Sequence, residues 1–508
     1  MASPLQNITV AAPGFRGLNT QDSPLSLDTS FASIADNCVI DQYGRIGARK
    51  GRELLTTNKE ILGSSSGITT IAECINTNGT TTVFSTGNNK IFTGTTTLVD
   101  VTPAGYTITA NDWKIVSFNF HCYFFQKNHE PLIFADHDGG LSRLQDHLHS
   151  TGVPPNGNEI LAAFGRLWVA DIEGNTHTIY WSDLLDGTGW AGGSSGSIDL
   201  STVWPTGYDE IVALAAHNNF LIIFGKNSII IYSGATSPAT MVLHDTIANV
   251  GCSHRDSVQN IGTDLLFFSK EGVRSLGRVI QEKSSPVRDI SKNVRNDLLY
   301  LLPFQTEKIK SVYSPENAFY LLSFPSSSVV YCFDMKTPLE DGSHRATVWT
   351  GVKILSFLRE QSGTLYLGNK DGINTYSGYL DNTDTYQLNY FTNPLDFGDS
   401  SRLKLLKELD LVFIGGQNTQ VTVNWGYDYT QTYTKEVITV KNSLLSEFNI
   451  AEFNVPLSEY GASIILDRKK VRPSGGGNVV TLGITVTINN VFISLQELNI
   501  QALIGRIL

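Results

Sequence analysis

Several features that would point to a familiar chemistry are scarce or missing in this chain of 508 residues. Methionine occurs only three times, and no apolar run approaches the length needed to cross a membrane. The opening MASPLQNITVAAPGF has neither the basic start nor the apolar core of a secretory signal. We therefore expect a chain that is soluble as made.

Cysteine and nucleotide-binding motifs add two further exclusions. The five cysteines are odd in number, scattered, and never spaced as CxxC, which predicts mostly buried, reduced thiols and neither a disulfide framework nor a zinc site. No P-loop or dinucleotide fingerprint opens a helix, so no cofactor is expected. Gly63 to Gly67 and Gly192 to Gly196 formally match G-x-S-x-G, but neither lies between a buried strand and a helix, which predicts loops.

An excess of positive charge is also absent. Lys and Arg number 37 against 48 Asp and Glu, which gives a formal net charge of -11. Affinity for nucleic acid comes mainly from cations that neutralise phosphates. The balance argues against a protein whose task is to grip DNA, although DNA could still pass nearby.

The chain does contain a repeated unit of two apolar strands joined by a tight polar turn, as in NNFLIIFGKNSIIIYSG and GTLYLGNKDGINTYSG. The units are rich in Val, Ile, Phe, Tyr and Thr, and their turns carry Gly, Asn, Asp and Ser, which favours strands over a helical solenoid. Seven copies are centred near Asn88, Asn128, Gly174, Lys226, Glu271, Ser327 and Asp371. Spacings of roughly 40 to 56 residues are typical of four-stranded propeller blades.

The sequence therefore predicts an all-β protein with a β-propeller of six or seven blades over residues 63–398. Residues 1–62 lack the repeat and are assigned to an N-terminal arm and docking segment. After about Ser400 the repeat stops, and the sequence pattern changes to longer strands with alternating residues. Residues 399–508 are therefore assigned to an antiparallel β-sandwich with a C-terminal tail. The copy near Ser327 departs most from the others and leaves the number of blades open.

Two helices are expected in this β-rich chain. In DISKNVRNDLLYLLP, the apolar residues from Ile290 to Leu302 follow helical spacing, and Asp289 or Ser291 can cap the helix. We expect this helix to be an insertion packed against the ring of blades. A shorter helical candidate runs from Phe31 to Cys38.

Two short basic segments are the candidate partner contacts. Their residues are Arg45, Arg49, Lys50 and Arg52 in the arm, and Arg468, Lys469, Lys470 and Arg472 in DRKKVRPSGGGN. On a strand, Arg468, Lys470 and Arg472 would share one face, able to contact an acidic partner or the DNA backbone. The competing interpretation of the second segment is a solvated hairpin tip.

One segment has a composition that suits metal binding. DHDGGLSRLQDHLH places Asp136, His137, Asp138, Asp146, His147 and His149 close together in the sequence. On a strand, His147 and His149 would face the same way, as metal ligands require, but the spacing matches no recognised ligand set. We favour a solvated loop and assign no metal.

A glycan hydrolase on a propeller scaffold is the alternative that the sequence leaves open. SDLLDGTGW, from Ser182 to Trp190, is similar to the Asp-box turn of sialidase-like propellers, but its glycine directly follows Asp186, which shifts the register. A hydrolase would also need paired carboxylates, or a tyrosine nucleophile, with arginines clustered on the propeller face. Arginines are sparse within the blades, so we interpret the chain as a protein that is not an enzyme. A monomeric scaffold that binds peptides is a third, weaker interpretation.

Several segments, taken in order, carry a family resemblance. GLNTQDSPLSLDTSFASIADNCVIDQYGRIGARKG combines Gly17, Leu18 and Asn19 with an Ala-rich turn that ends at Asn37, followed by Gly44, Arg49 and Gly51. The segment VGCSHRDSVQNIGTDLLFFSKEGVRSL and the hairpins before it follow, and PLDFGDSSRLKLLKELDL leads into the last region. Together these segments resemble the tail nozzle (packaged-DNA stabilisation) proteins of short-tailed bacteriophages, from their amino-terminal pattern through their blades to their carboxy-terminal sandwich.

The resemblance implies a structural virion protein of the tail, made in the host cytoplasm and without an active site. The implied assembly is a ring of identical subunits, with six expected, below the portal and the tail adaptor protein. Such a ring retains packaged double-stranded DNA and forms the ejection channel, and tail fibre or needle proteins are further candidate partners. A closed ring needs two different, complementary patches on each subunit.

The charge of such a ring carries its own expectation. Six copies at -11 each total -66, so DNA would meet like charge if much of it lines the channel. We expect an acidic or neutral lumen, no sequence-specific binding, and no lining by the run from Arg468 to Arg472. Because a small propeller is filled by its own strands, the duplex should pass between subunits.

Overall fold

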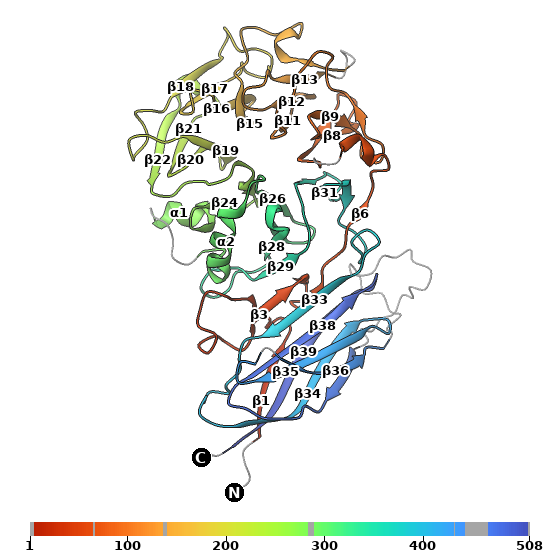
Figure 1. The fold of residues 1–508 in the computed structure, drawn as a ribbon. Helices are drawn as coiled ribbons and strands as arrows, with labels where there is room; N and C mark the ends of the chain where they lie inside the picture. The colour runs from red at the N-terminus through yellow and green to blue at the C-terminus, as the bar shows by residue number, and fades with distance from the viewer. Residues whose placement is uncertain are drawn as a thin grey trace.

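The computed structural model describes residues 5–63, 67–135, 140–282, 289–430, 432–441 and 466–505. It has two parts, a β-propeller and a β-sandwich, which lie at opposite ends of the molecule (Figure 1). The first described strand and the last one pair with each other, Leu5 opposite Leu503, at the end of the sandwich that lies away from the propeller.

The propeller has seven blades of antiparallel strands; six blades are small separate sheets, and blade 6 is part of a larger sheet. Blades 1 to 3 consist of β7 (Thr70–Ile75), β8 (Thr81–Gly87), β9 (Lys90–Thr93) and β10 (Val99–Asp100); β11 (Lys114–Phe118), β12 (His121–Phe125), β13 (Leu132–Ala135) and β14 (Gly140–Arg143); and β15 (Gly157–Ala163), β16 (Arg166–Ile172), β17 (Thr178–Trp181) and β18 (Gly196–Asp199). Blades 4 and 5 consist of β19 (Ile211–His217), β20 (Phe220–Gly225), β21 (Ser228–Ser233) and β22 (Val242–Ala248), and of β23 (Gln259–Asn260), β24 (Leu265–Ser269) and β25 (Gly272–Ser275).

The last two blades close the ring. Blade 6 consists of β26 (Lys310–Ser314), β27 (Phe319–Phe324), β28 (Val329–Asp334) and β29 (Ala346–Thr350), and blade 7 of β30 (Ser356–Arg359), β31 (Leu365–Asn369), β32 (Gly372–Thr375) and β6 (Glu53–Leu54). The inner strand β30 contacts β7, so the last blade meets the first. Because β6 comes from the start of the chain, the N-terminal segment itself completes blade 7.

The seven predicted hairpins are confirmed, and each forms the second and third strands of one blade. The degenerate copy near Ser327 is the β27–β28 hairpin of blade 6, which settles the number of blades at seven. Side chains alternate between the two faces of each strand, and both faces of a blade pack against neighbouring blades. The strands are therefore apolar on both faces. In β20 and β21, for example, Ile222 and Ile231 pack toward blade 5, whereas Ile223 and Ile230 pack toward blade 3.

The sandwich draws on both ends of the chain. One sheet contains β37 (Leu466–Val471), β34 (Lys404–Gly415), β39 (Ile493–Ile504), β5 (Ile46–Ala48) and β4 (Cys38–Ile40), with β1 (Leu5–Ala11) also paired to β39. The other contains β3 (Phe31–Asp36), β33 (Tyr386–Thr392), β38 (Val480–Ile488), β35 (Gln420–Tyr427) and β36 (Thr434–Thr439), with β2 (Gly17–Leu18) beside β3. Leu409 and Leu411 of the first sheet face Val423 and Ile484 of the second across the buried core.

Strand pairing crosses the domain boundaries that the sequence placed after residues 62 and 398. The loss of the hairpin repeat set those boundaries, but β1, β3, β4 and β5 of the arm belong to the sandwich, as does β33 before residue 399. Strand β29 of blade 6 also pairs in parallel with β3, Val348 opposite Asp36. One ten-stranded sheet therefore runs from the propeller into the sandwich.

The short helix predicted from Phe31 to Cys38 is wrong, because this segment forms strand β3 and the start of β4. A register shift between Ala32 and Ile34 in the pairing with β33 interrupts the alternation of buried and exposed residues. The spacing of apolar residues that suggested a helix in this segment therefore arises from a β-bulge.

The longer helix is confirmed in its position. Helix α2 (Arg295–Leu301) packs against β25, and α1 (Leu276–Glu282) follows blade 5 in place of a fourth strand. The side chains of the two predicted caps bind the backbone of β25 instead. Asp289 accepts a hydrogen bond from the Ser275 N–H, and Ser291 accepts one from the Val273 N–H. The remaining helical turns are η1 (Lys59–Leu62), η2 (Leu144–Asp146), η3 (Pro238–Thr240), η4 (Arg255–Ser257), η5 (Lys292–Val294), η6 (Leu302–Phe304) and η7 (Pro325–Ser327).

Two cysteines depart from the expectation of reduced thiols. Cys74 of β7 and Cys122 of β12 form a disulfide between blades 1 and 2, with a Cα–Cα distance of 5.9 Å. Cys38, Cys252 and Cys332 are buried free thiols, as predicted. Within the described ranges, every helix is too short or too polar to cross a bilayer.

Candidate functional site

The first basic segment lies at the junction between the propeller and the sandwich, and two of its four residues are buried there. Arg49 is 2% exposed and binds Asp381 through two hydrogen bonds, Nη1 to Oδ1 at 2.9 Å and Nη2 to Oδ2 at 2.7 Å. Its Nε also donates to Asn37 Oδ1 at 3.1 Å, and its guanidinium lies 4.0 Å from the centre of the Tyr386 ring. Burial alone would lower the pKa of Arg49, but its bonds and attraction to Asp381 raise it above the ordinary value.

The other three residues of this segment differ in exposure. Arg45 is 1% exposed and binds Asp41 at 2.6 Å. Arg52 is partly exposed, 3.9 Å from Asp381, and Lys50 is exposed. The prediction that Arg45 and Arg49 contact a partner is therefore corrected. Both form internal ion pairs, because each is already held by a carboxylate of its own chain.

The residues that carried the family resemblance in the arm have geometric roles at the same junction. A Cβ on Gly51 would lie 1.9 Å from the Leu380 carbonyl oxygen, and Gly17 has a φ of +76° with the Ala346 carbonyl oxygen 2.6 Å from its Cβ position. Asn37 also has a positive φ, and its amide donates to Thr350 Oγ1 and to the Gln387 carbonyl oxygen. The pattern thus marks positions where this junction requires glycine or asparagine.

The second basic segment forms β37, at one edge of the sandwich. Arg468 and Lys470 are each 56% exposed and lie on one face, where they bind Asp410 at 3.2 Å and Glu408 at 2.6 Å. Lys469 points the other way and binds Asp467, and Arg472 follows the strand as an exposed residue. The shared face of Arg468 and Lys470 is confirmed, although acidic groups of β34 already neutralise much of its charge.

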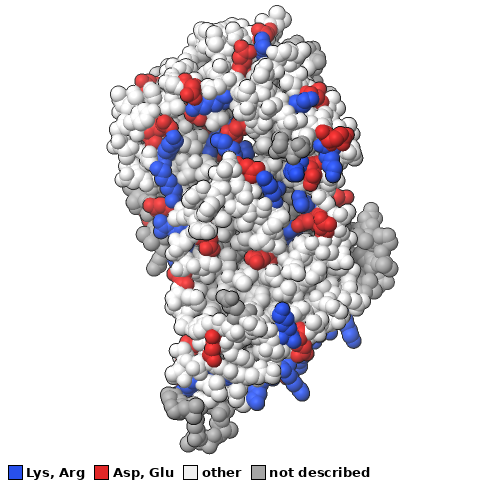
Figure 2. Space-filling view, viewed as in Figure 1, with Lys and Arg blue, Asp and Glu red and all other residues white. Residues whose placement is uncertain are grey.

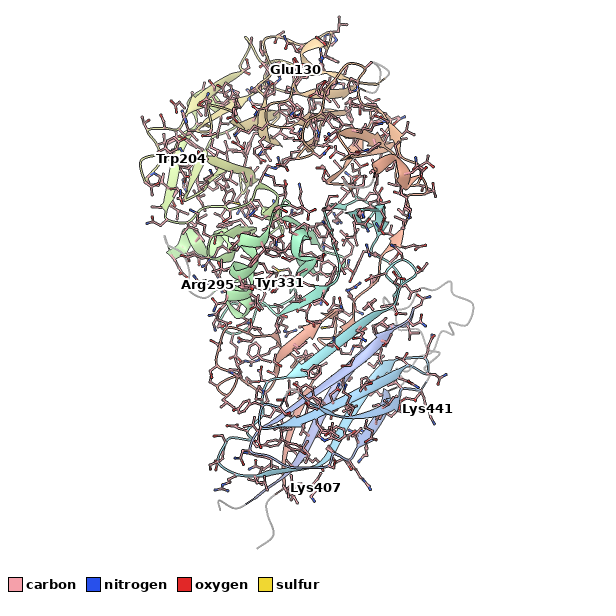
Figure 3. All side chains as sticks on the ribbon, in the orientation of Figure 1. Glu130, Trp204, Arg295, Tyr331, Lys407 and Lys441 are labelled. Atoms are coloured by element: carbon pink, nitrogen blue, oxygen red, sulfur yellow. A yellow bond between two sulfur atoms is a disulfide. The ribbon has the colours of Figure 1, made fainter. Side chains whose placement is uncertain are left out.

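Other exposed cations are spread around the sandwich. Lys407 and Lys441 are exposed and extend from its periphery, whereas Tyr331 lies inside blade 6 (Figure 3). On the face drawn in Figure 2, acidic and basic side chains are interspersed and much of the surface is uncharged. No large area of one sign is visible on that face.

The histidine-rich segment forms a helical turn and a loop instead of the strand on which the metal argument depended. His147 is buried, His149 is exposed, and their ring centres lie 5.8 Å apart. Asp136, His137 and Asp138 lie outside the described residues. Among the residues that are described, no group of three or more potential ligands could hold a metal ion.

The loop that is similar to an Asp-box connects β17 to β18 of blade 3. Asp186 Oδ1 accepts hydrogen bonds from the N–H and the hydroxyl of Thr188, and Asp183 Oδ1 accepts from the N–H and the hydroxyl of Ser194. The predicted loop around Gly192 is confirmed. These contacts stabilise the turn itself, and they use both of its carboxylates.

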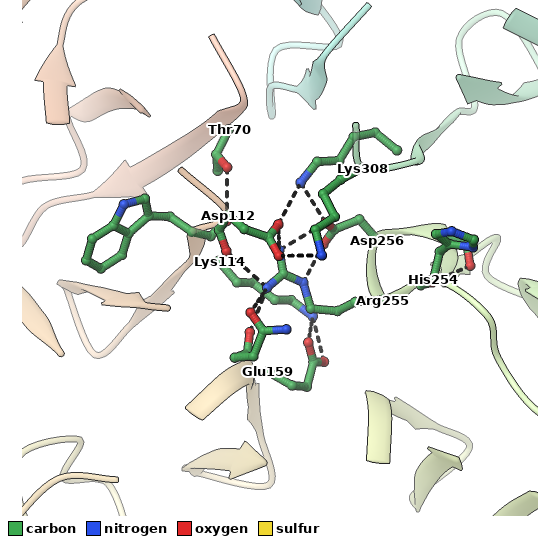
Figure 4. Close-up of polar contacts among 12 residues, drawn as sticks. Thr70, Asp112, Lys114, Glu159, His254, Arg255, Asp256 and Lys308 are labelled. Atoms are coloured by element: carbon green, nitrogen blue, oxygen red, sulfur yellow. Dashed lines mark hydrogen bonds and ion pairs between the residues drawn. The ribbon is translucent and has the colours of Figure 1, made fainter. Parts of the chain in front are cut away.

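A set of charged residues that sequence analysis missed meets at the centre of the propeller (Figure 4). We call it the axial cluster; it consists of Asp112, Lys114, Glu159, Arg255, Asp256, Lys308 and Lys310. Lys114, Glu159 and Lys310 lie on the inner strands of blades 2, 3 and 6, and Arg255 and Asp256 lie in η4, which occupies the inner position of blade 5.

Arg255 is the hub of the axial cluster. Its Nη2 lies 3.0 Å from Asp112 Oδ1, its Nε lies 3.0 Å from Asp256 Oδ1, and its Nη1 donates to the backbone and side-chain oxygens of Asn158 at 2.7 and 2.8 Å. Lys310 binds Asp256 at 2.6 Å, which adds blade 6. A single guanidinium thus joins blades 2, 3 and 5.

Glu159 extends the cluster to blade 4. This residue is fully buried, accepts two hydrogen bonds from Lys114 Nζ at 2.6 and 2.7 Å, and accepts one from the Leu214 N–H at 2.9 Å. Every carboxylate of the cluster is therefore paired with a cation, and five consecutive blades are connected across the centre.

Burial and ion pairing shift the pKa values of two carboxylates of the axial cluster in opposite directions. Burial alone would raise the pKa of Asp256, but Arg255 and Lys310 hold it far below its usual range. Burial raises the pKa of Glu159, and attraction to Lys114 and Arg255 offsets only part of that rise. Asp256 thus stays ionised and Glu159 has no exposed surface, so neither can donate a proton to a bound glycan.

His254, next to the axial cluster, gives the propeller a predicted dependence on pH. Burial, followed by repulsion from Lys308, lowers its pKa to about 4. Because the unfolded chain binds this proton near pH 6.5, stability is complete above that pH and falls as the pH drops toward 4. We expect a loss of about 2 kcal/mol at pH 5 relative to pH 7.5 from this residue.

Chemical denaturation of the wild type and of His254→Gln at the two pH values measures this contribution. The variant should lose less stability on acidification, by about 2 kcal/mol. His244→Gln, which changes an exposed histidine on β22, should behave as the wild type. Equal pH dependence in all three proteins would contradict the assignment.

A cleft of about 310 Å³ lies between the arm and blade 6. Aromatic residues such as Phe319, Tyr376 and Phe492 line it, together with charged residues, several of which are held in ion pairs. Asp334, for example, lies 3.2 Å from Lys336 and 3.5 Å from Arg345. This lining assigns no ligand.

Comparison with known proteins adds no family. No protein-family model matches the chain, and no curated protein does. Among solved structures, the extracellular domain of a one-component system of B. thetaiotaomicron is 12% identical, with a TM-score of 0.40, over 73% of this chain and 45% of its own. The Pan2 WD40 domain of Neurospora crassa is 12% identical over 69% of this chain and 97% of its own (TM-score 0.36), and YCF48 bound to D1 peptide is 11% identical over 62% and 93% (TM-score 0.36).

The chain thus spans less than half the length of the first of these proteins. All three likenesses are at low identity, and with TM-scores below 0.5 they carry no argument.

Proposed function

We propose that this chain is a structural subunit of a bacteriophage tail nozzle, assembled as a ring below the portal and its adaptor. In this role the ring retains packaged DNA and forms the channel for ejection. The resemblance of the segments around Gly17, Asn37 and Gly51 is the starting point. The proposal is supported by the position of these residues, which make close contacts where the propeller meets the sandwich.

The observation that carries a structural role is the axial cluster. A propeller enzyme binds its substrate over the centre of the ring of blades, where free carboxylates or an arginine cluster are needed. In this propeller, Arg255 and its neighbours already form ion pairs with one another among blades 2 to 6. A duplex would accordingly pass between subunits, along the axis of the assembly, and not through one propeller.

The surface charge is compatible with this role. Arg468 and Lys470 of β37 are paired with Glu408 and Asp410, so the most basic run offers little free charge to phosphates. Lys50, Arg52 and Arg472 are the remaining candidates for contacts with the adaptor or with fibre proteins.

The test is the state of assembly. Mass photometry and negative-stain imaging, with and without the adaptor protein, should reveal a hollow ring of about six times the 55.7 kDa of the chain. A chain that stays monomeric under both conditions and hydrolyses sialylated or capsular glycans would overturn the proposal in favour of the sialidase-like alternative.

A further inference from the structure

Strands β37 and β1 lie at opposite edges of the first sandwich sheet. In the part of the chain that the structure describes, β1 pairs with β39 alone, and β37 pairs with β34 alone. Each edge strand therefore has one row of backbone N–H and C=O groups that no described strand uses. Such a row is a template for pairing with another chain.

Strand β1 carries none of the features that normally protect an edge. Its sequence LQNITVA has seven residues without charge or proline, and its pairing with β39 is regular throughout. The N–H of Ala12 donates to the Gln496 carbonyl oxygen, so the even-numbered residues before it hydrogen-bond to β39. Leu5, Asn7 and Thr9 direct their backbone groups away from the subunit, and all three are exposed.

Strand β37 is rich in cations, which on an edge strand usually discourage association. In this chain those charges are matched from within: Arg468 and Lys470 bind acids of β34, and Lys469 binds Asp467. An approaching strand would meet paired charges and not a row of free cations.

The strand directions fit a continuous sheet. Strands β1 and β39, β39 and β34, and β34 and β37 are each antiparallel, so β1 and β37 run in opposite directions. A rotation about an axis along the strands preserves direction, so β37 of one copy would arrive antiparallel to β1 of the next. Because the two edges differ, the contact is head-to-tail, and such a contact gives a ring when the rotation between successive copies closes.

The faces of the two strands also match. Register places Thr9 opposite Asn499, Asn499 opposite Asp410, and Asp410 opposite Lys470, so these four residues form one row across the sheet. Thr9 and Lys470 lie on the outward face, whereas Val10 and Val471 are buried. Joining the edges would keep the polar outward face continuous, and on the inward face it would continue the row of Val10 and Val471 alongside the Lys469–Asp467 ion pair.

We propose that subunits of the ring are joined by pairing of β1 of one copy with β37 of a second copy. This inference rests on the ring-shaped assembly proposed above. It assigns the two complementary surfaces that a closed ring requires: residues 5–11 at one edge of the sandwich sheet and residues 466–471 at the other.

Proline at Asn7 tests the β1 edge. Asn7→Pro removes an outward N–H that β39 does not use, and proline is tolerated at such edge positions. We expect an unchanged melting temperature and a rise of about tenfold or more in the concentration at which half of the protein forms rings, measured by mass photometry. The matched control Asn7→Ala keeps the N–H and should assemble as the wild type. Full assembly of Asn7→Pro would overturn the inference.

Disulfide trapping tests both edges together. Thr9→Cys or Asn7→Cys, combined with Arg468→Cys or Lys470→Cys, should give covalent oligomers up to the closed ring in one register, and neither single variant should cross-link. The chain's own cysteines are buried or paired and do not interfere. Dimers from a β1 cysteine alone would overturn the inference by revealing a symmetric contact.

The same experiments separate the two proposals. Rings that form in the wild type but neither cross-link nor respond to Asn7→Pro would refute the edge pairing and leave the nozzle assignment intact. Pairing that appears only when the adaptor is added, between adaptor and β1, would assign the edge to a different partner and would also refute the inference. A wild type that forms no ring with or without the adaptor would refute the proposed function itself.

Discussion

Replacing Arg255 with methionine is expected to lower the free energy of unfolding of the propeller by about 3–5 kcal/mol. The side chain is 6% exposed and binds Asp112 and Asp256, so its removal leaves two carboxylates at the centre of the propeller with fewer cations. Breaking a buried ion pair by removing one partner is costly because the remaining charge is left uncompensated. Denaturation followed by tryptophan fluorescence measures the loss.

Lys308→Met is the matched control for Arg255→Met. Lys308 contacts the same Asp112 at 3.4 Å but is 64% exposed, so we expect a change of at most about 1 kcal/mol. Adding Asp256→Asn to Arg255→Met should cost less than the two single changes together, because each removes part of the same charge imbalance. Equal effects of Arg255→Met and Lys308→Met would show that the axial cluster is not a structural hub.

The second large effect is expected at the junction. Arg49→Met should destabilise the protein by about 3–5 kcal/mol, since it removes both bonds to Asp381 and the contact with the Tyr386 ring. The segment that leads from β32 to β33 contains Asp381, so limited proteolysis there should become faster. Arg49→Lys keeps the charge but cannot form the two-pronged contact, and an intermediate loss is expected.

Arg52→Met distinguishes this role from a general effect of charge at the junction. Arg52 is partly exposed and 3.9 Å from the same Asp381, so its replacement should cost at most about 1 kcal/mol. If Arg49→Met left stability and proteolysis unchanged and weakened only assembly with the adaptor, the assignment of Arg49 as an internal residue would be wrong.

The sequence predicted the repeat, the class of fold and the number of hairpins, because alternation and turn residues are local signals. In NNFLIIFGKNSIIIYSG, the turn and both strands lie within one short stretch. The closure of blade 7 by β6 could not be predicted in this way. Glu53 and Leu54 pair with residues more than three hundred positions away, and two residues carry no recognisable strand pattern.

The candidate site was harder to predict than the fold, for a physical reason. An arginine in a sequence has the same letter whether it is solvated or paired, and Arg49 is buried only because Asp381 lies opposite it. The axial cluster had a weak signal: Lys114, Glu159 and Lys310 are charged residues at or near the start of the first strand of a blade. Which carboxylate meets which cation depends on the arrangement of the blades, which one hairpin does not contain.

The pairing of the first strand with the last one constrains how the chain can be made. Strand β1 leaves the ribosome well before β39, the partner that covers it, which lies more than four hundred residues later in the chain. At roughly 5–20 residues per second, the delay is on the order of half a minute or longer. During that time all seven blades can form while β1 is still unpaired, so this protein should complete its sandwich only after β39 has been synthesised, and the unpaired edges should be the segments that most need shielding.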